Sequence, residues 1–262
     1  MKTVLTIAGS DCSGGAGIQA DLKTITAFGL YGESVITALT AQNTMGVTDI
    51  LPIPPDFLKK QLESVFTDIV PDAVKLGMIT GVEQMEVIRD CLIKYQAKHV
   101  VIDTVMVSTS GKNLMQPEAF DFYRQKLLPL AQLYTPNLPE AEMLLKRTIK
   151  TREERVAAVR EFALQYKGMI YLKGGHDELC ADDLLCEGQK LTWFLAPHLA
   201  NTNTHGTGCT LSSAIACGLA MELGGEESAR KAKEYLTGAI ADGLDLGRGN
   251  GPLNHMYRMK KS

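Results

Sequence analysis

Short runs of β-branched and other apolar residues alternate along this chain with longer segments that carry the three- and four-residue apolar spacing of helices. This alternation predicts right-handed crossovers between parallel strands, and therefore a three-layer α/β fold with a mostly parallel central sheet. The expected strands are Val4–Ala8, Ser34–Thr40, Ala73–Leu76, Val100–Val105, Leu133–Pro136 and Met169–Lys173. The expected helices cover Pro55–Thr67, Val82–Gln96, Pro117–Leu130, Thr151–Lys167, Cys209–Leu223 and Glu226–Leu246.

The region Asp182–Phe194 has a different pattern, with two short apolar runs on either side of the turn centred on Gly188. This pattern predicts a hairpin, which would form a small antiparallel edge of the sheet. Another local signal is Thr151 followed by Glu154, a capping box that marks the start of a helix. The 24 glycines and 10 prolines form no linker-like stretch, so we expect residues 1–262 to form one domain.

The composition narrows the classes of function. Hydrophobic residues make up 45% of the chain, which supports a large core and excludes a disordered protein. The 27 basic and 30 acidic residues include no Lys/Arg-rich run, so we expect a small-molecule partner and neither nucleic acid nor a membrane surface. The first apolar run is too short for a signal sequence, and the six cysteines form no C-x-x-C pair. We therefore expect a cytoplasmic protein with reduced thiols.

A glycine-rich segment, Gly9–Gly17, follows the first expected strand and leads into a helix. Glycines allow the backbone to approach a ligand closely, so this segment is either a ligand-binding loop or only a tight turn. Gly15–Ala20 also matches the G-x-G-x-x-A pattern of dinucleotide-binding oxidoreductases. The glycines lie several residues beyond the strand, and no acidic residue ends the second strand to bind a ribose, so an oxidoreductase is disfavoured.

A second glycine-rich segment, Thr204–Thr210, immediately precedes a helix. Gly206 and Gly208 would align backbone N–H groups toward one point, where the helix dipole adds partial positive charge. We expect an anion hole suited to phosphoryl transfer, and we expect the pKa of the Cys209 thiol at the helix start to be lowered. The alternative is an ordinary helix cap by Thr207. The chain has no P-loop motif, so a nucleotide must bind in another way.

Polar residues follow three further strands, at the edge of the sheet where α/β proteins bind ligands. Asp103 ends an apolar run and is expected at this edge, unless it only caps the next loop. Asn137 and Glu140 could hold hydrated Mg²⁺ beside nucleotide phosphates, or Asn137 could be a helix cap. Lys173 could reach a nucleotide phosphate as a point charge, or it could be a solvated loop residue.

Gln42 follows a mostly apolar strand, and its side-chain amide can both donate to and accept from the edge of a heterocycle. It is therefore a candidate for recognising an aromatic substrate. No two histidines have metal-ligand spacing, so we expect all five to be structural. They are His99, His176, His198, His205 and His255.

Eight segments together resemble the hydroxymethylpyrimidine/phosphomethylpyrimidine kinases of thiamine biosynthesis, in order and over almost the whole chain. They are Ala8–Asp11, Ser13–Thr24, Val35–Thr44, Lys75–Met78, Asp103–Met106, Thr135–Ala141, Lys173–His176 and Asn203–Ser212. The resemblance implies a ribokinase-like fold and an enzyme that uses Mg-ATP to phosphorylate 4-amino-5-hydroxymethyl-2-methylpyrimidine and then its monophosphate. Pyridoxal or pyridoxine kinase, which shares the fold, is the alternative, and the family implies a homodimer.

The resemblance also implies roles for individual residues. The pyrimidine would lie among Gly9, Ala16, Asp21, Thr40, Gln42, Met78 and Val105, with Gln42 at the ring edge. ATP would contact Asn137, Glu140 and Lys173, and Mg²⁺ would be held by Asp103 and Glu140. The catalytic anion hole would be formed by Gly206, Thr207, Gly208 and Cys209. Similar sugar kinases carry an Asp that acts as general base at the position of Cys209, so the resemblance leaves open whether this thiol is a base.

Overall fold

The computed structural model describes residues 1–106, 117–175, 181–196, 199, 201 and 203–259. Its strands are β1 (Thr3–Asp11), β2 (Tyr31–Asn43), β3 (Gly46–Pro52), β4 (Ala73–Leu76), β5 (Val100–Ile102), β6 (Leu133–Tyr134), β7 (Met169–Leu172), β8 (Asp183–Glu187) and β9 (Lys190–Phe194). Its α-helices are α1 (Gly17–Ala27), α2 (Pro55–Phe66), α3 (Val82–Lys94), α4 (Pro117–Phe122), α5 (Leu138–Leu145), α6 (Arg152–Gln165), α7 (Thr207–Ala220) and α8 (Gly225–Ala241).

The strands form one sheet in the order β3-β2-β1-β4-β5-β6-β7-β8-β9. The run from β2 to β7 in this order is parallel, which confirms the predicted mostly parallel sheet. The hairpin of β8 and β9 is antiparallel, as predicted from Asp182–Phe194. On the other side, β3 adds a second antiparallel edge that the sequence did not predict. None of the residues of β3 is fully buried, so the strand carries no alternation of core and solvent positions to reveal it.

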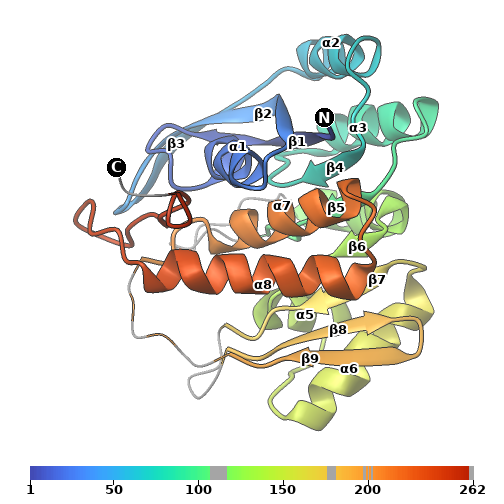
Figure 1. Ribbon diagram of the computed structural model, residues 1–262. Helices are drawn as coiled ribbons and strands as arrows, with labels where there is room; N and C mark the ends of the chain where they lie inside the picture. Colours follow the sequence, from blue (N-terminus) through green and yellow to red (C-terminus); the bar gives the residue numbers. More distant parts are fainter. Residues whose placement is uncertain (107–116, 176–180, 197–198, 200, 202, 260–262) are drawn as a thin grey trace.

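Residues of the central strands point alternately to the two faces of the sheet, which divides the core in two. Leu5 and Ile102 pack with α2, α3, α5 and α6, whereas Val4 and Val101 pack with α1, α7 and α8. Figure 1 shows α1, α7 and α8 covering the near face of the sheet. Burying one such side chain contributes about 1.5–3 kcal/mol, so both faces of each central strand favour a covering helix. This arrangement confirms the predicted three layers.

Two helices differ from their predicted bounds. The helix expected over Glu226–Leu246 ends at Ala241, and Gly243 just beyond it takes a left-handed conformation with φ of 60°. The helix expected over Pro117–Leu130 is α-helical only at its start and continues as a π-helical turn and then a 3-10 turn. Pro129 lies in that last turn and has no N–H for a regular helical hydrogen bond, which accounts for the irregular end.

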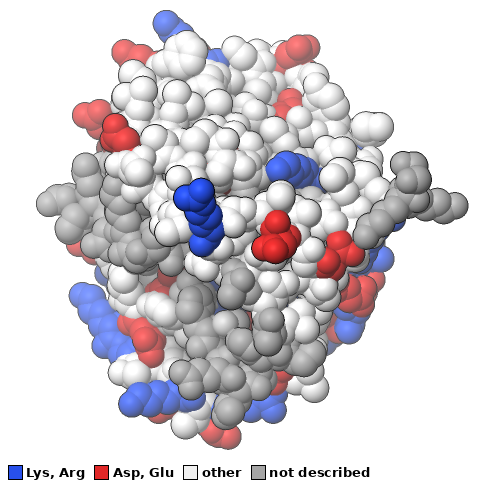
Figure 2. All heavy atoms as spheres, turned by 90° about the vertical axis from the view of Figure 1, so that its left-hand side faces the viewer, with Lys and Arg blue, Asp and Glu red and all other residues white. Residues whose placement is uncertain are grey.

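The face of the molecule in Figure 2 carries its charged side chains singly or in small groups of both signs, with no broad basic area among the residues coloured there. None of the described helices has the length and apolar character that crossing a bilayer requires. The cysteines in the described part of the chain are free thiols, namely Cys12, Cys91, Cys186, Cys209 and Cys217. The predictions for Cys180, His176 and His198 fall outside the described residues.

Candidate active site

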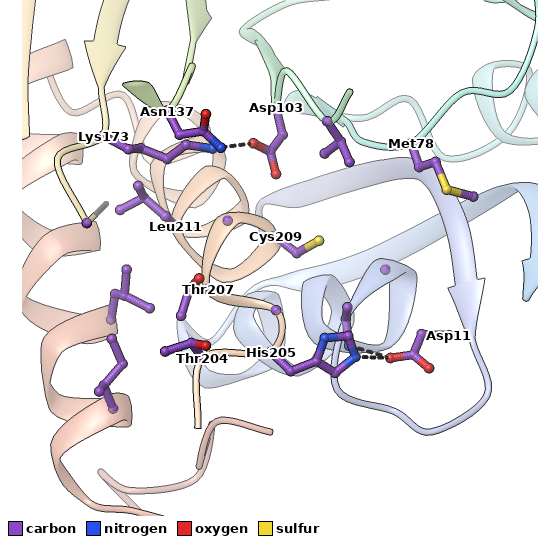
Figure 3. A pocket seen from close by; sticks show the side chains of 18 of the residues that line it. Asp11, Met78, Asp103, Asn137, Lys173, Thr204, His205, Thr207, Cys209 and Leu211 are labelled. Atoms are coloured by element: carbon purple, nitrogen blue, oxygen red, sulfur yellow. Dashed lines mark hydrogen bonds and ion pairs between the residues drawn. The ribbon is translucent and has the colours of Figure 1, made fainter. Parts of the chain in front are cut away.

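A cavity of about 670 Å³ opens where the parallel strands end, between the first glycine-rich segment and the start of α7. Its walls come from the ends of β1, β2, β4, β5, β6 and β7, so the sheet edge brings together segments that are far apart in the sequence. The predicted site residues that line it are Gly9, Ala16, Thr40, Gln42, Met78, Asp103, Val105, Asn137, Glu140, Lys173, Gly206, Thr207, Gly208 and Cys209. Figure 3 shows Cys209 between the ion pair of Lys173 with Asp103 and the contact of His205 with Asp11.

The start of α7 is formed by two loops that interlock. Gly206 takes a left-handed conformation with φ of 83°, and a Cβ at this position would overlap the carbonyl oxygen of Gly15. The two glycine-rich segments pack directly against each other, and because of this close approach only glycine fits at position 206. The N-cap residue is Gly206, which has no side chain, so the alternative in which Thr207 caps the helix is wrong. The backbone N–H of Thr207 donates to the carbonyl oxygen of Thr204 at 3.3 Å. The next N–H groups, those of Gly208 and Cys209, have no acceptor within the first turn of the helix and are available to an anion.

Three charged side chains meet at one end of the cavity. Lys173 Nζ lies 2.9 Å from Asp103 Oδ1 and 3.8 Å from Glu140 Oε2. The side chain of Lys173 is only 15% exposed, so it is not the solvated loop lysine of the alternative. Burial alone would lower the pKa of Lys173, but the charges of Asp103 and Glu140 outweigh burial and raise that pKa. The ammonium group therefore stays protonated at neutral pH.

The two carboxyl groups at this end differ in their pKa shifts. Burial would raise the pKa of Asp103, but the charges of Lys173 and Lys75 outweigh burial and lower it. Burial raises the pKa of Glu140, and the negative charge of Asp103 adds to that effect against the opposing charge of Lys173. Asp103 is therefore the more strongly ionised of the two groups, because it lies closer to the ammonium group.

Gly208, in the first turn of α7, faces the ion pair of Lys173 with Asp103. A Cβ added at Gly208 would lie 3.3 Å from Asp103 Oδ2 and 3.6 Å from Lys173 Nζ. The absence of a side chain therefore leaves space between the backbone N–H groups of the helix and the ammonium group. Hydrogen-bond donors and a positive charge on opposite sides of one space are the features that bind a phosphoryl group.

Asn137 is the cap of α5. Its Oδ1 accepts a hydrogen bond from the backbone N–H of Glu140 at 2.8 Å, and Glu140 Oε2 accepts one from the backbone N–H of Asn137 at 2.8 Å. This capping box matches the one that Thr151 and Glu154 form at the start of α6, as the sequence predicts there. The interpretation of Asn137 as a helix cap is thus confirmed, although the residue also lines the cavity. The cap holds the Glu140 carboxylate beside Lys173.

Asp103 and Glu140 are also the residues predicted to hold Mg²⁺. In the described part of the chain, no group of three or more His, Cys, Asp or Glu side chains could bind a metal by itself. Mg²⁺ commonly keeps several waters and is held by one or two carboxylates together with substrate phosphates. The two carboxylates at this end of the cavity fit a cation shared with a nucleotide in that way.

The prediction of a lowered pKa for the Cys209 thiol is wrong. Burial raises this pKa to about 11; Lys75 opposes the rise, while Asp21 and Asp103 add to it. At pH 7, roughly one such thiol in ten thousand is ionised. The loss of water around Cys209 outweighs the opposing effects of the Lys75 charge and the Gly17 N–H, so the neutral thiol is the form that predominates at pH 7.

Asp21, unlike the other residues predicted to contact the substrate, does not line the cavity. Its side chain is fully buried and accepts hydrogen bonds from Thr6 Oγ1 at 2.6 Å, Lys75 Nζ at 2.8 Å and Ser213 Oγ at 2.7 Å. These bonds join α1 to β1, β4 and α7. The predicted contact with the substrate is corrected to a structural role, because no surface of Asp21 is open to a ligand.

Gln42 lines the cavity beside His205. Figure 3 shows His205 on the other side of Cys209 from the pair of Lys173 and Asp103. It directly follows a shift in the register between β2 and β3, at Ala41 and Gln42. Irregularities of this kind commonly turn a side chain toward a ligand site. The side-chain amide lies 3.1 Å from Thr40 Oγ1 through its Oε1 and 3.2 Å from His205 Nε2 through its Nε2. Both ends of the amide thus lie within hydrogen-bond distance of a protein group.

Sequence reasoning missed two residues at this end of the cavity, Asp11 and His205. His205 Nε2 lies 2.8 Å from Asp11 Oδ2, and both residues line the cavity. His205 was expected to be only structural because it has no histidine partner at metal spacing. Its position inside the second glycine-rich segment, opposite an acidic residue inside the first, is the signal that could have found it.

Comparison with known proteins gives the family. The family model described as phosphomethylpyrimidine kinase matches residues 11–254. The hydroxymethylpyrimidine/phosphomethylpyrimidine kinase of Escherichia coli strain K12 is 46% identical over 259 residues, which cover 97% of each protein. A thiamine biosynthesis bifunctional protein of Geobacter sulfurreducens is 47% identical over 256 residues; they cover 97% of this chain but only 52% of that longer protein.

A solved structure confirms the fold. The ADP complex of Bacillus subtilis pyridoxal kinase is similar with a TM-score of 0.90 and 34% identity, over 98% of each chain. Because the family model matches most of the chain and the Escherichia coli relative matches nearly all of it, this chain belongs to the phosphomethylpyrimidine kinase family.

Proposed function

We propose that this protein transfers a phosphoryl group from ATP to the hydroxymethyl group of 4-amino-5-hydroxymethyl-2-methylpyrimidine, and a second one to the resulting monophosphate. The product would be the pyrimidine diphosphate used in thiamine biosynthesis. One observation carries the proposal: a single cavity has the open start of α7 beside Lys173 at one end and the amide of Gln42 at the other. The first end suits phosphoryl groups, and the second suits the edge of a heterocycle.

The mechanism relies on positioning and on charge. Gln42 binds the ring, so that the hydroxymethyl arm extends toward the start of α7. Backbone N–H groups of Gly208 and Cys209 donate to the phosphoryl oxygens, and Lys173 neutralises their charge as the group moves. Phosphoryl transfer passes through a loose transition state, in which the bond to ADP breaks as the acceptor oxygen bonds to phosphorus. The acceptor hydroxyl releases its proton late, to an oxygen of the transferred phosphoryl group or to water, so a strong base is not required. A neutral thiol at Cys209 is compatible with this course.

We also propose Mg²⁺ as the cation of the site. Asp103 and Glu140 would hold it through carboxylate oxygens, with the nucleotide phosphates and water as its other ligands. When bound, Mg²⁺ neutralises negative charge on the phosphates during transfer. The strongly ionised Asp103 is the better of the two ligands, since its pKa is lowered whereas that of Glu140 is raised.

Replacing Cys209 with Ala is expected to lower kcat by about tenfold or less, because the variant loses one weak hydrogen bond of a neutral thiol. A general base would contribute roughly 10²- to 10⁴-fold. The measurement is kcat with saturating ATP and pyrimidine at pH 7 and at pH 9. A loss greater than a hundredfold at both pH values would identify the thiol as the proton acceptor and contradict this mechanism.

Replacing Gln42 with Leu is expected to lower kcat/KM for the pyrimidine roughly 100-fold, because Leu has a similar volume but can neither donate nor accept a hydrogen bond. The KM for ATP should stay within about twofold, since the nucleotide binds at the other end of the cavity. Gln189→Leu, in the exposed turn between β8 and β9, is the matched control and should have no effect. An unchanged kcat/KM for the pyrimidine in Gln42→Leu would overturn the role of this amide.

Pyridoxal is the second candidate acceptor, because a pyridoxal kinase has the same fold with a TM-score of 0.90 and 34% identity. Both compounds are small aromatic rings with a hydroxymethyl arm, so discrimination depends on the ring edge that Gln42 faces. The test is the turnover of both compounds by the unmodified enzyme. A higher kcat/KM for pyridoxal than for the pyrimidine would favour this second candidate.

We propose that the enzyme is a homodimer formed at the β3 edge of the sheet. Leu39 of β2 and Leu51 of β3 are cross-strand partners, so their side chains lie together on one face. They are 43% and 63% exposed, beside the open edge of β3, where an unpaired strand can add a second chain. Sedimentation of the purified chain tests the proposal, and a monomer at concentrations of roughly 10 μM would overturn it.

We further propose that residues 1–262 act as one domain in the cytoplasm. The continuous sheet from β3 to β9 and the cavity built along its edge support a single domain. The free thiols and the need for ATP support a location in the cytoplasm, because the cytoplasm keeps thiols reduced. Limited proteolysis that released a stable folded fragment carrying only half of the sheet would contradict a single domain.

A further inference from the structure

The carboxylate of Asp11 is held as an ionised acceptor by five donors. Its Oδ1 accepts from the Ser13 backbone N–H at 2.9 Å and from Ser13 Oγ at 2.8 Å. Its Oδ2 accepts from the backbone N–H groups of Gly15 at 3.1 Å and Ala16 at 2.8 Å, and lies 2.8 Å from His205 Nε2. Burial would raise the pKa of Asp11, but the hydrogen bonds from His205 and Ser13 hold that pKa well below its usual range. Asp11 therefore has no proton to donate to His205.

The negative charge of Asp11 determines which ring nitrogen of His205 carries a proton. A contact of 2.8 Å between Nε2 and an ionised carboxylate requires an N–H donor, so Nε2 of His205 carries a proton. Gln42 lies 3.2 Å from the same nitrogen. A protonated Nε2 cannot accept a hydrogen bond, and an amide NH₂ group facing it would place two donors against each other. The one Nε2 proton is directed mainly at Asp11, so an oxygen of Gln42 facing Nε2 would share it at the longer distance, whereas an NH₂ group there would be repelled.

The orientation of Gln42 that places its amide oxygen toward His205 also gives its amide nitrogen a hydrogen-bond partner. The oxygen and nitrogen of an amide exchange places by a half-turn about its last bond, so the hydrogen-bond partners decide which one faces His205. With the oxygen of Gln42 toward His205, its nitrogen donates to Thr40 Oγ1 over the 3.1 Å contact. Thr40 Oγ1 then donates its own proton to the carbonyl oxygen of Ser10, 3.0 Å away. Every group in the chain from Asp11 to Ser10 has a partner.

We propose that His205, held as a donor by Asp11, is a positioning residue that determines which way the amide of Gln42 faces and thereby the substrate edge that the enzyme selects. This inference rests on the proposed function. In the selected orientation the amide oxygen keeps one free lone pair on the His205 side, and the nitrogen keeps one free proton on the Thr40 side. The site thus favours a ring whose edge presents an exocyclic amine to the amide oxygen of Gln42 and a ring nitrogen to its N–H.

A double-mutant cycle tests whether His205 acts through Gln42. His205→Phe is expected to lower kcat/KM for the aminopyrimidine roughly 10- to 100-fold, with the KM for ATP unchanged. In the Gln42→Leu background, the same change should cause no further loss, because the residue it positions is gone. His205→Gln should recover most of the activity, since its side-chain NH₂ can take the place of Nε2–H.

Discrimination against the analogue that lacks the 4-amino group gives a second readout. The unmodified enzyme should prefer the aminopyrimidine to 5-hydroxymethyl-2-methylpyrimidine. The His205→Phe variant should show a smaller preference, because the side-chain amide of Gln42 can then turn freely. Losses that multiply in the double variant, or an unchanged preference in His205→Phe, would overturn the positioning role while leaving the proposed function intact. An unmodified enzyme that phosphorylates neither pyrimidine would overturn the proposed function, and this inference with it.

Discussion

Replacing Lys173 with Met is expected to lower kcat by roughly 100- to 1,000-fold, the loss typical of removing one group that stabilises charge in a transition state. Lys173 Nζ lies 2.9 Å from Asp103 and faces the first turn of α7 across Gly208. Met has a similar length but no charge, so the carboxylates of Asp103 and Glu140 would face the phosphoryl group without their neutralising partner. The measurement is kcat with saturating ATP and pyrimidine.

Two further variants control this experiment. Lys190→Met removes a lysine whose side chain is 66% exposed on β9 and pairs with Glu226, and it should leave kcat unchanged. Lys173→Arg keeps the charge on a wider, planar group, so it should restore only part of the activity. A kcat for Lys173→Met within threefold of the unmodified enzyme, with an intact melting transition, would contradict the assigned role.

Replacing Lys75 with Met is expected to lower the free energy of unfolding by about 3–5 kcal/mol, the usual cost of leaving one partner of a buried ion pair alone. The melting temperature should fall by about 10 °C. Lys75 Nζ lies 2.8 Å from Asp21 Oδ2, and neither side chain has exposed surface. Burial would lower the pKa of Lys75, but the charge of Asp21 outweighs burial and raises it, so the ammonium is the form present. Urea unfolding measures the effect.

The matched control removes the second charge as well. Asp21→Asn in the Lys75→Met background keeps oxygen and amide groups for Thr6 and Ser213 but leaves no buried charge unpaired. The double variant should therefore regain at least half of the stability lost in the single variant. A single variant that loses less than about 1 kcal/mol, or a double variant that is less stable than the single one, would contradict the ion-pair account.

The central sheet could be predicted from the sequence because its strands are buried on both faces. The run Ala73–Leu76 has the bounds that the pattern predicts, since all four residues are buried. β3 escaped prediction because an exposed edge strand carries no periodic signal. The end of α8 was placed five residues too late, at Leu246 rather than Ala241, because the apolar spacing continues past the helix while the backbone turns at Gly243.

Some features of the site could also be predicted from the sequence, whereas others could not. Local signals found the loop before α7 and the polar side chains after the strands, because each of these depends on neighbours in the sequence. The pKa of Cys209 and the burial of Asp21 depend on long-range packing around Lys75, which no local pattern records. The pair of Asp11 and His205 is separated by 194 positions and is visible only once both glycine-rich segments meet.

The most direct test of the proposed kinase is the mass of the products formed from Mg-ATP and a panel of acceptors. The panel contains the hydroxymethylpyrimidine, its monophosphate, pyridoxal, pyridoxine and ribose, and ADP release is recorded for each. We predict that both pyrimidines are converted, ending at the diphosphate, with the highest kcat/KM among the panel. Conversion of pyridoxal with no conversion of either pyrimidine would contradict it and move the assignment to vitamin B6 phosphorylation.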